Sequence, residues 1–209
     1  VAAINNLANS YKSLTKLDIA EELYLKVLKI NPKYIHALNN YGNLKLQIGD
    51  FKSSINLYLK ALEINPNQLN ILFSLASAYQ ESGDFENSKK IANKILSIDY
   101  KNTSAHKLIS GMTNYKEDKD HLSKMEKLLE VKGVSDEQLI DLSFALGKAY
   151  EDMENYQKSY IHLEKGNKLK KIRTNYKMNN QAKLFKSIIK IFEDFNFNNL
   201  KKKINNKKI

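Results

Sequence analysis

The sequence predicts an all-α solenoid made of helix-turn-helix units. The first observation is a 34-residue repeat, because Asn31-Pro32 returns as Asn65-Pro66 and Gly49-Asp50-Phe51 returns as Gly83-Asp84-Phe85. The second is the spacing of apolar residues, which has the period of a helix within each unit. The third is composition: 7 Gly and 2 Pro in 209 residues are too few for a sandwich rich in turns.

Each regular unit is expected to contain two helices. In the second unit the apolar residues three or four apart are Leu38, Tyr41 and Leu44, followed by Ile55, Tyr58 and Leu62. A Gly-Asp pair separates these two segments, and Asn-Pro ends the second one. The unit is therefore read as helix, short turn, helix and turn.

We expect five units over residues 1–173, at about 1–34, 35–68, 69–102, 103–135 and 136–173. The fourth unit is degenerate, because it lacks both the Gly-Asp turn and the terminal Pro. Its second helix is expected to end at Lys132-Gly133-Val134, with Ser135 or Asp136 as the N-cap of the next helix. The fifth unit recovers the pattern.

One more amphipathic helix is predicted at about 178–195. Leu184, Ile188, Ile191 and Phe195 lie four, three and four residues apart, and Ile189 and Phe192 widen the same stripe. Segment 174–195 is either a cap on the last unit or a linker. Residues 196–209 form a basic tail that we expect to be mobile.

The repeats resemble the tetratricopeptide repeat (TPR). The matching residues are Ile4, Leu7-Ala8, Tyr11, Ala20, Tyr24 and Pro32 in the first unit, Leu38, Tyr41-Gly42, Ser54, Tyr58, Ala61 and Pro66 in the second, and Leu72, Leu75-Ala76, Tyr79, Ser88 and Ala92 in the third. Tyr100 stands where the third Pro would be. The resemblance implies a right-handed superhelix whose first helices line a concave surface that binds proteins or peptides.

Amide side chains recur on the expected concave face. Asn6 and Asn9 return as Asn40 and Asn43, and each pair shares a helix face. The candidate peptide-binding residues are Asn6, Asn9, His36, Asn40, Asn43, Gln47, Asn70, Ser74 and Gln80. Amides donate and accept hydrogen bonds, which suits the backbone of an extended peptide. We expect these sites to be on the surface, so that Asn40→Ala with Asn43→Ala barely changes folding.

The expected concave face can be compared with those of two classes of TPR protein. In TPR proteins resembling the O-linked N-acetylglucosamine transferases, an Asn before the Leu-Ala or Leu-Gly pair forms an amide ladder, and Asn6 and Asn40 stand there. Ser74 interrupts the ladder in the third unit. The carboxylate-clamp class is disfavoured, because Asn5, Asn70 and Ser74 replace its basic residues. The alternative is that abundant Asn and Lys reflect an AT-rich, bacterial genome.

The net charge of +11 is concentrated in the last segment. Residues 171–209 contain 11 basic and 2 acidic residues, whereas the rest of the chain is close to neutral. A polyanion-binding tail would use Lys201, Lys202, Lys203, Lys207 and Lys208. Nucleic-acid binding is not expected, because Arg173 is the one Arg available for bidentate base contacts. Self-association through exposed ends of the array is a further expected interaction.

The composition favours a non-enzymatic chain. Zero Cys excludes disulfides and Cys-ligated zinc and fits a reducing, cytoplasmic location. No apolar run is long enough to cross a membrane. His36, His106, His121 and His162 show no metal spacing, so we expect no metal and no cofactor. No catalytic residues are expected in this chain.

A second resemblance covers about residues 140–195. The run from Phe144 to Lys171, FALGKAYEDMENYQKSYIHLEKGNKLKK, is similar to the last repeat of bacterial TPR-sulfotransferases. In that family Tyr176 and the helix that follows would lead into a catalytic domain with a phosphate-binding loop. The resemblance implies that this chain is the non-catalytic N-terminal part of a larger sulfotransferase, and we keep this as the alternative to a peptide-binding scaffold.

Overall fold

The computed structural model describes residues 1–117, 119–174 and 185–189, and the chain divides into two compact units, Val1–Asn167 and Lys168–Ile209. The helices of the described residues are α1 (Ala2–Ser13), α2 (Leu17–Ile30), α3 (Ile35–Gln47), α4 (Phe51–Ile64), α5 (Leu69–Glu81), α6 (Phe85–Ile98), α7 (Thr103–Gly111), α8 (Asp120–Leu129), α9 (Asp136–Asp152) and α10 (Tyr156–Arg173). Residues 185–189 are also helical.

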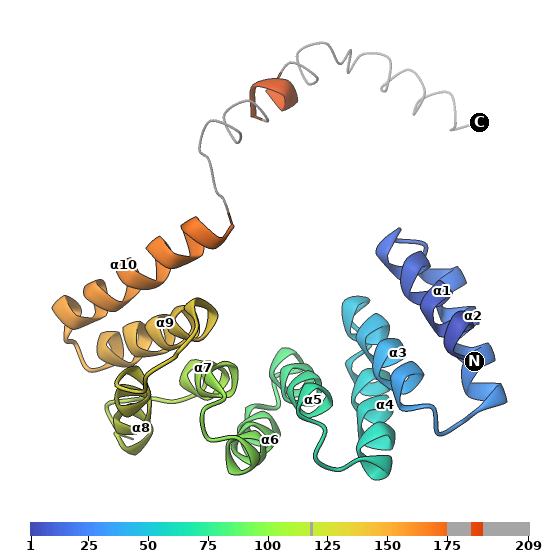
Figure 1. The fold of residues 1–209 in the computed structure, drawn as a ribbon, viewed down its shortest axis with the longest axis horizontal. Helices are drawn as coiled ribbons and strands as arrows, with labels where there is room; N and C mark the ends of the chain where they lie inside the picture. The colour runs from blue at the N-terminus through green and yellow to red at the C-terminus, as the bar shows by residue number, and fades with distance from the viewer. Residues whose placement is uncertain (118, 175–184, 190–209) are drawn as a thin grey trace, which may run out of the picture. The chain divides into compact units, whose positions relative to one another are not determined.

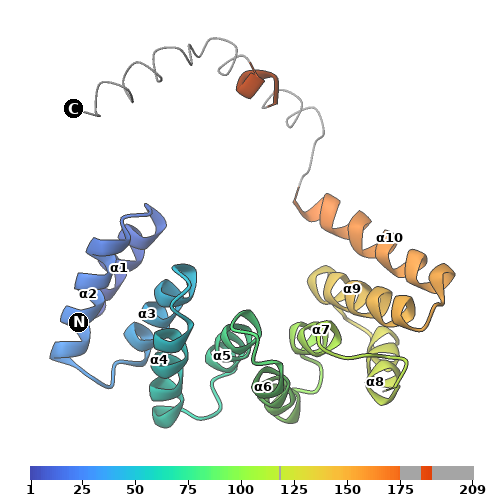
Figure 2. The same ribbon diagram turned by 180° about the vertical axis from the view of Figure 1, so that it is seen from behind.

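The helices up to α6 pack as consecutive hairpins. α1 packs on α2, α3 on α4 and α5 on α6, and each hairpin contacts the next through α2 and α3, α4 and α5, and α6 and α7. The odd-numbered helices α1, α3 and α5 also contact one another in sequence. In Figures 1 and 2 these three helices lie on one side of the 1–167 unit, and α2, α4 and α6 lie on the other.

The Gly-Asp pairs form the turns inside the regular hairpins. Gly49 and Gly83 have φ angles of 80° and 84°, a conformation that glycine adopts without steric cost. Asp50 and Asp84 then cap α4 and α6, each accepting a hydrogen bond of 3.1 Å from a backbone N–H three residues later. Thr15 takes the same left-handed position in the first hairpin, with a φ of 58°. The turn is therefore kept even where the Gly is not.

Small residues allow the two helices of a hairpin to approach closely. A Cβ atom on Gly42 would lie 2.6 Å from Cε1 of Tyr58, which fills the space opposite. Gly147 of α9 has the same relationship with Leu163 of α10, where a Cβ atom would lie 2.6 Å from Cδ2. In these two hairpins a small and a large position of the sequence pattern are thus paired.

The fourth unit divides the apolar core. Leu108 and Ile109 of α7 belong to a cluster with Ala76 and Ala92, whereas Leu122, Met125 and Leu128 of α8 belong to a separate cluster with α9. α8 ends at Leu129, which is earlier than the predicted end at Lys132-Gly133-Val134, because residues 130–134 form a loop in which Gly133 has a φ of 84°. Ser135, rather than Asp136, is the N-cap of α9.

The Lys168–Ile209 unit is described only in part. It contains the end of α10 and the helical residues 185–189, which include Ile188 and Ile189 of the predicted stripe. Leu184, Ile191, Phe192 and Phe195 lie outside the described residues, as does the basic tail from residue 196. The cap or linker role of 174–195 therefore stays a prediction.

Candidate functional site

The candidate residues come from α1, α3 and α5. We call the solvent-facing side of these three helices the odd-helix face. Among the described residues, the side-chain amides of Asn6, Gln47 and Asn70 are exposed and make no hydrogen bond within the chain. His36 is also exposed, with its ring edge-on to Tyr34 at 5.5 Å between ring centroids. These four side chains are placed where a ligand could contact them.

Asn9 and Asn43 have a structural role that the sequence pattern did not predict. The hydroxyl of Tyr24 donates to Oδ1 of Asn9 at 2.5 Å, and the hydroxyl of Tyr58 donates to Oδ1 of Asn43 at 2.7 Å. Both Asn residues are half-buried, and both Tyr side chains are fully buried. Asn40 is half-buried as well, so the expectation that Asn40 and Asn43 are surface sites is wrong, and the effect of their removal on folding stays a prediction.

The two Tyr hydroxyls remain protonated donors over the usual pH range. Burial raises the pKa of Tyr24 to about 12. Burial also raises the pKa of Tyr58, and this effect outweighs the lowering of the pKa by the nearby Ser74 hydroxyl. A protonated hydroxyl can donate to the Asn Oδ1 atom, so each pair is a stable link between the two helices of one hairpin.

Asn40 links neighbouring hairpins. Its Nδ2 donates to Oδ1 of the buried Asn5 at 3.3 Å, across the contact between α1 and α3. Asn39 is the residue one repeat after Asn5, and among the described residues its buried Oδ1 accepts no hydrogen bond. The equivalent of Asn40 is Ser74, which instead donates to the carbonyl of Asn70 at 3.0 Å. The amide link between hairpins is thus made once and lost at the next unit.

Gln80 is the last of the candidate residues along the chain. It is half-buried in α5, and its Nε2 lies 3.5 Å from the position that a Cβ atom on Gly111 of α7 would take. This places Gln80 at the junction of the third and fourth units. The structure therefore joins the candidate Asn40 to Asn5, which was not among the predicted residues, and distributes the candidates along three adjacent helices.

One charged group of α3, Lys45, is paired with a carboxylate of α2. Lys45 Nζ lies 2.7 Å from Oε1 of Glu21, and the Tyr41 hydroxyl donates to the same oxygen at 2.7 Å. The hydrogen bonds from Lys45 and Tyr41 lower the pKa of Glu21, and the hydrogen bond to Glu21 raises the pKa of Lys45. Lys45 is therefore directed to α2, and the candidate residues of α1, α3 and α5 are uncharged.

At α7 and α9 the exposed amides give way to charged and hydroxyl side chains that bond to each other or to the backbone. Asp141 is buried and accepts from Ser104 Oγ at 2.7 Å and from Lys107 Nζ at 2.9 Å. Ser110 Oγ donates to the carbonyl of Ala145 at 2.9 Å. These contacts join α7 to α9 by polar groups, and they neutralise the Lys107 charge at the end of the amide-bearing surface.

Two of the four His residues lie in a buried hydrogen-bonded series. His106 Nε2 contacts the Tyr100 carbonyl at 2.9 Å, so it must carry a proton and donate. Its Nδ1 then accepts from His121 Nε2 at 2.9 Å, and His121 Nδ1 accepts from the Tyr115 hydroxyl at 2.6 Å. All three side chains are neutral and satisfied in this arrangement. Burial, the largest cause, lowers the pKa of His106.

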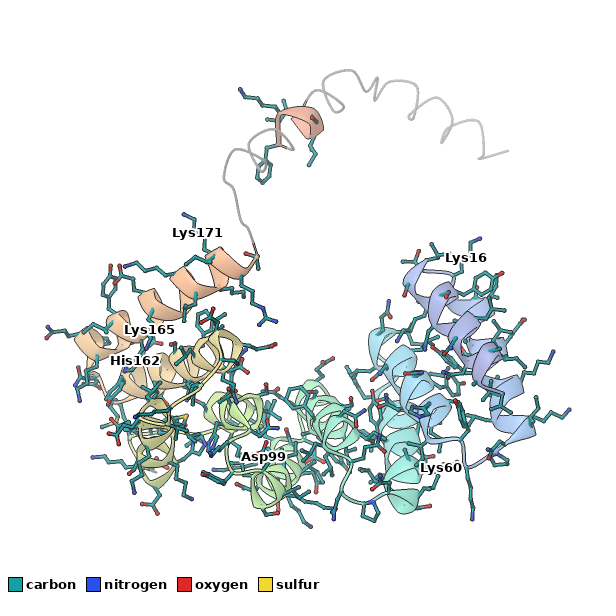
Figure 3. The ribbon with its side chains drawn as sticks, viewed as in Figure 1. Lys16, Lys60, Asp99, His162, Lys165 and Lys171 are labelled. Carbon is teal, nitrogen blue, oxygen red and sulfur yellow. The ribbon has the colours of Figure 1, made fainter. Side chains whose placement is uncertain are left out.

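The described residues contain no group of three or more His, Cys, Asp or Glu side chains arranged to hold a metal ion. None of the described helices is both long enough and apolar enough to cross a membrane. The exposed amides of the odd-helix face have hydrogen-bonding capacity that no described residue uses. Figure 3 shows side chains projecting from both sides of the helix array in the 1–167 unit.

Family comparison identifies the class of repeat. The tetratricopeptide repeat model matches residues 1–34 and 69–102, and a TPR repeat model matches residues 42–83. The chain therefore contains TPR repeats in its first three units, and the predicted all-α TPR fold is confirmed. The search of curated proteins found no match.

Solved structures share this fold. A crystal structure of MamA is 17% identical with a TM-score of 0.63, and the match covers 81% of this chain and 97% of MamA. MamA from residue 41 to its end, from Desulfovibrio magneticus RS-1, is 13% identical with a TM-score of 0.63, covering 81% and 94%. YrrB, described as a TPR protein with an unusual peptide-binding site, is 18% identical with a TM-score of 0.59, covering 79% and 84%. At these identities the likeness concerns the fold.

Proposed function

We propose that this chain is a scaffold that binds an extended peptide on the odd-helix face. The observation that carries the proposal is the exposed, uncharged amide surface of Asn6, Gln47 and Asn70 on three adjacent helices. An extended peptide has backbone N–H and C=O groups with no partner of their own, and a side-chain amide can satisfy both kinds. The structural neighbour YrrB is described as having a peptide-binding site, which supports the same class of function.

The candidate residues favour an uncharged partner. They include no Lys or Arg that could hold a C-terminal carboxylate, and the nearby Lys45 is engaged by Glu21. A TPR face without such cations does not favour a negatively charged peptide end. We therefore propose that the partner presents an uncharged, extended segment from within a protein chain, and that amides contact its backbone.

Exposed amides provide the test. A peptide selected from a random displayed library against the full chain is titrated into the chain and its variants by calorimetry. Asn6→Ala with Asn70→Ala should weaken the selected peptide by roughly 1 to 3 kcal/mol, because backbone hydrogen bonds to the peptide are lost. Neither side chain makes a hydrogen bond to any residue that the structure describes, so the melting temperature should not change.

Asn56→Ala is the matched control, because Asn56 is exposed on α4 rather than on the odd-helix face. It should leave the peptide affinity unchanged. Equal affinities for the double variant and the wild-type chain would reject the odd-helix face as the binding surface.

The alternative is that this chain is the non-catalytic part of a sulfotransferase. It is supported by the sequence similarity of Phe144–Lys171, and the family and structure matches give it no support. Tyr176 of that pattern lies outside the described residues. The gene sequence beyond Ile209 tests this alternative, which requires a strand followed by a phosphate-binding loop.

The cellular location and the weakness of nucleic-acid binding are both inferred from composition. A cytoplasmic location is inferred from the lack of Cys. Weak or no nucleic-acid binding is inferred from the single Arg. Binding to DNA or RNA that falls steeply with salt concentration would contradict this second inference.

A further inference from the structure

The degenerate fourth unit contains a cleft that the odd-helix face does not include. Its volume is about 570 Å³, and its lining residues are Asn93, Leu96, Ser97, Tyr100, His106, Lys124, Lys127, Leu128 and Val131. These come from α6, the segment after it, α7, α8 and the loop that follows α8. Figure 1 shows α6 and α8 on either side of α7. The volume lies in the range of sites that hold small organic molecules.

The cleft exists because the apolar core is divided at this point. Leu96 packs against the clusters of the preceding units, whereas Leu128 and Val131 belong to the cluster of α8 and α9. α7 is nine residues long and ends at Gly111, and α8 begins at Asp120. The apolar residues on the two sides therefore form walls that face a common space instead of closing on each other.

The walls and the rim of the cleft differ in chemistry. Leu96, Leu128 and Val131 supply aliphatic surface, and Leu128 is 6% exposed at the base of the cleft. His106 is 2% exposed, and both its ring nitrogens are already engaged by Tyr100 and His121. The interior of the cleft thus offers apolar surface and the edge of a neutral ring.

Two cations stand at the rim. Lys124 and Lys127 are three residues apart on α8, so they share a helix face, and both are exposed. Among the described residues neither forms an ion pair, and the lining contains no carboxylate. The Lys124 charge also acts on His106. Burial is the main cause that lowers the pKa of His106, and Lys124 lowers this pKa further. Asp99 opposes this effect on His106 but does not line the cleft, so an anion held at the rim would be the group facing both ammonium groups.

We propose that this cleft binds a small amphipathic anion, a medium-chain aliphatic carboxylate, with its chain against Leu96, Leu128 and Val131 and its carboxylate at Lys124 and Lys127. The apolar walls favour burial of the hydrocarbon chain. The two ammonium groups supply charge-assisted hydrogen bonds to the carboxylate. This site is independent of peptide binding on the odd-helix face, and either function can be present without the other.

Octanoate and its uncharged analogue octanamide are the probes. Each is titrated into the full chain by calorimetry. Octanoate should bind saturably and at least tenfold more tightly than octanamide. Lys124→Gln with Lys127→Gln should remove that preference, so that octanoate binds this variant as weakly as octanamide binds the wild-type chain. Both Lys side chains are exposed, so folding should be unchanged.

Lys90→Gln with Lys94→Gln is the control, because both residues are exposed on α6 outside the lining and the change in net charge is the same. It should leave octanoate affinity unchanged. Ser97→Trp tests the location, since the exposed Ser97 lines the cleft and an indole would occupy it. This variant should lose binding of both probes.

Three results would overturn the proposal. The first is no saturable binding of octanoate to the wild-type chain. The second is equal affinity of octanoate for the wild-type chain and the Lys124/Lys127 variant. The third is full binding to a folded Ser97→Trp variant, which would place the ligand elsewhere. A lost peptide affinity with intact octanoate binding would concern the odd-helix face alone.

Discussion

The Tyr58 hydroxyl donates a hydrogen bond of 2.7 Å to Oδ1 of Asn43, and the two residues belong to opposite helices of one hairpin. Tyr24 and Asn9 repeat this relationship one unit earlier. In the third unit both partners change together, to Ala92 and Ser77. The recurring Asn is thus explained in part by an internal hydrogen bond, and the joint loss in the third unit agrees with that explanation.

Tyr58→Phe should lower the free energy of unfolding by about 1 kcal/mol, because it removes this hydrogen bond and leaves the half-buried Asn43 Oδ1 without its donor. Urea denaturation followed by circular dichroism measures the change. Tyr156→Phe is the control, because Tyr156 is 67% exposed. Combining Tyr58→Phe with Asn43→Ala should cost less than the two single changes added together.

Ser74→Asn should stabilise the chain by about 0.5 to 1.5 kcal/mol. The new amide would stand where Asn40 stands one unit earlier, and it could donate to the buried Oδ1 of Asn39 as Asn40 donates to Asn5. Ser77→Asn is the matched control. Position 77 corresponds to Asn43, but Ala92 stands where Tyr58 would be, so the new amide has no Tyr hydroxyl to accept from. Equal effects of the two substitutions on the urea midpoint would contradict the inter-hairpin link.

Glu21→Gln should destabilise the contact between the first two hairpins by about 1 kcal/mol, a modest value because Glu21 is partly exposed and screened. The substitution weakens the contacts of one oxygen with both Lys45 and Tyr41. The loss should be smaller in high salt. Glu22→Gln changes the adjacent, exposed residue and should leave the melting temperature unchanged.

The stability of the chain should fall as the pH is lowered from about 7 to 5. Burial is the largest cause that lowers the pKa of His106 below its ordinary value of 6.5. The Tyr100 carbonyl and Asp99 raise the pKa of His106, whereas Lys124 lowers it further. The unfolded chain therefore binds a proton in this range before the folded chain does.

The stability from neutral His106 is present above pH 6.5 and is lost on acidification toward its folded pKa. Urea midpoints at several pH values measure this dependence. His106→Gln should flatten it, and His36→Gln, at an exposed site, should not. A His106→Gln variant with the full wild-type pH dependence would show that other groups cause it. His162, whose pKa is also lowered chiefly by burial, is the first such group to test.

Self-association should increase with concentration through the exposed apolar residues of α1. Leu7 is 48% exposed and Leu14 is 64% exposed, and Ile4 and Tyr11 on the same helix are half-buried. Leu7→Lys with Leu14→Lys should shift the chain toward the monomer in sedimentation equilibrium. Leu59→Lys, at a 41% exposed site on α4, is the control. A wild-type chain that stays monomeric at high concentration would rule this out.

The sequence was most informative where turn chemistry repeats. Gly49-Asp50 and Gly83-Asp84 predicted the breaks between helices, because a left-handed Gly followed by an Asp cap has few alternatives. In the fourth unit no such pair exists, and α8 ends before the predicted position. There α8 is followed by a loop that contains Gly133, and the unit is held by packing between distant segments, such as His106 against His121, which a local pattern does not contain.

The candidate site was predicted only in part for a related reason. A 34-residue period shows which positions recur, but it does not separate Asn6, which is exposed, from Asn9, which is bonded to Tyr24. The sequence did contain a signal that distinguishes bonded Asn residues from exposed ones. Tyr58 follows Asn43 at the same distance along the chain as Tyr24 follows Asn9. The cleft beside Lys124 could not be predicted from the sequence. It arises because Leu96 on one side does not pack against Leu128 and Val131 on the other, and no local pattern records this.

The divided core also has a mechanical consequence. In a solenoid each interface contributes separately, so a chain under tension yields where neighbouring parts are least tightly joined. The apolar clusters on either side of the fourth unit are separate, although α7 and α9 are themselves in extensive contact, which includes the hydrogen bonds of Ser104 and Lys107 to Asp141 and of Ser110 to Ala145. Pulled from residues 1 and 167, the chain should therefore extend in separate steps rather than in one, because the apolar clusters before and after this division are not continuous.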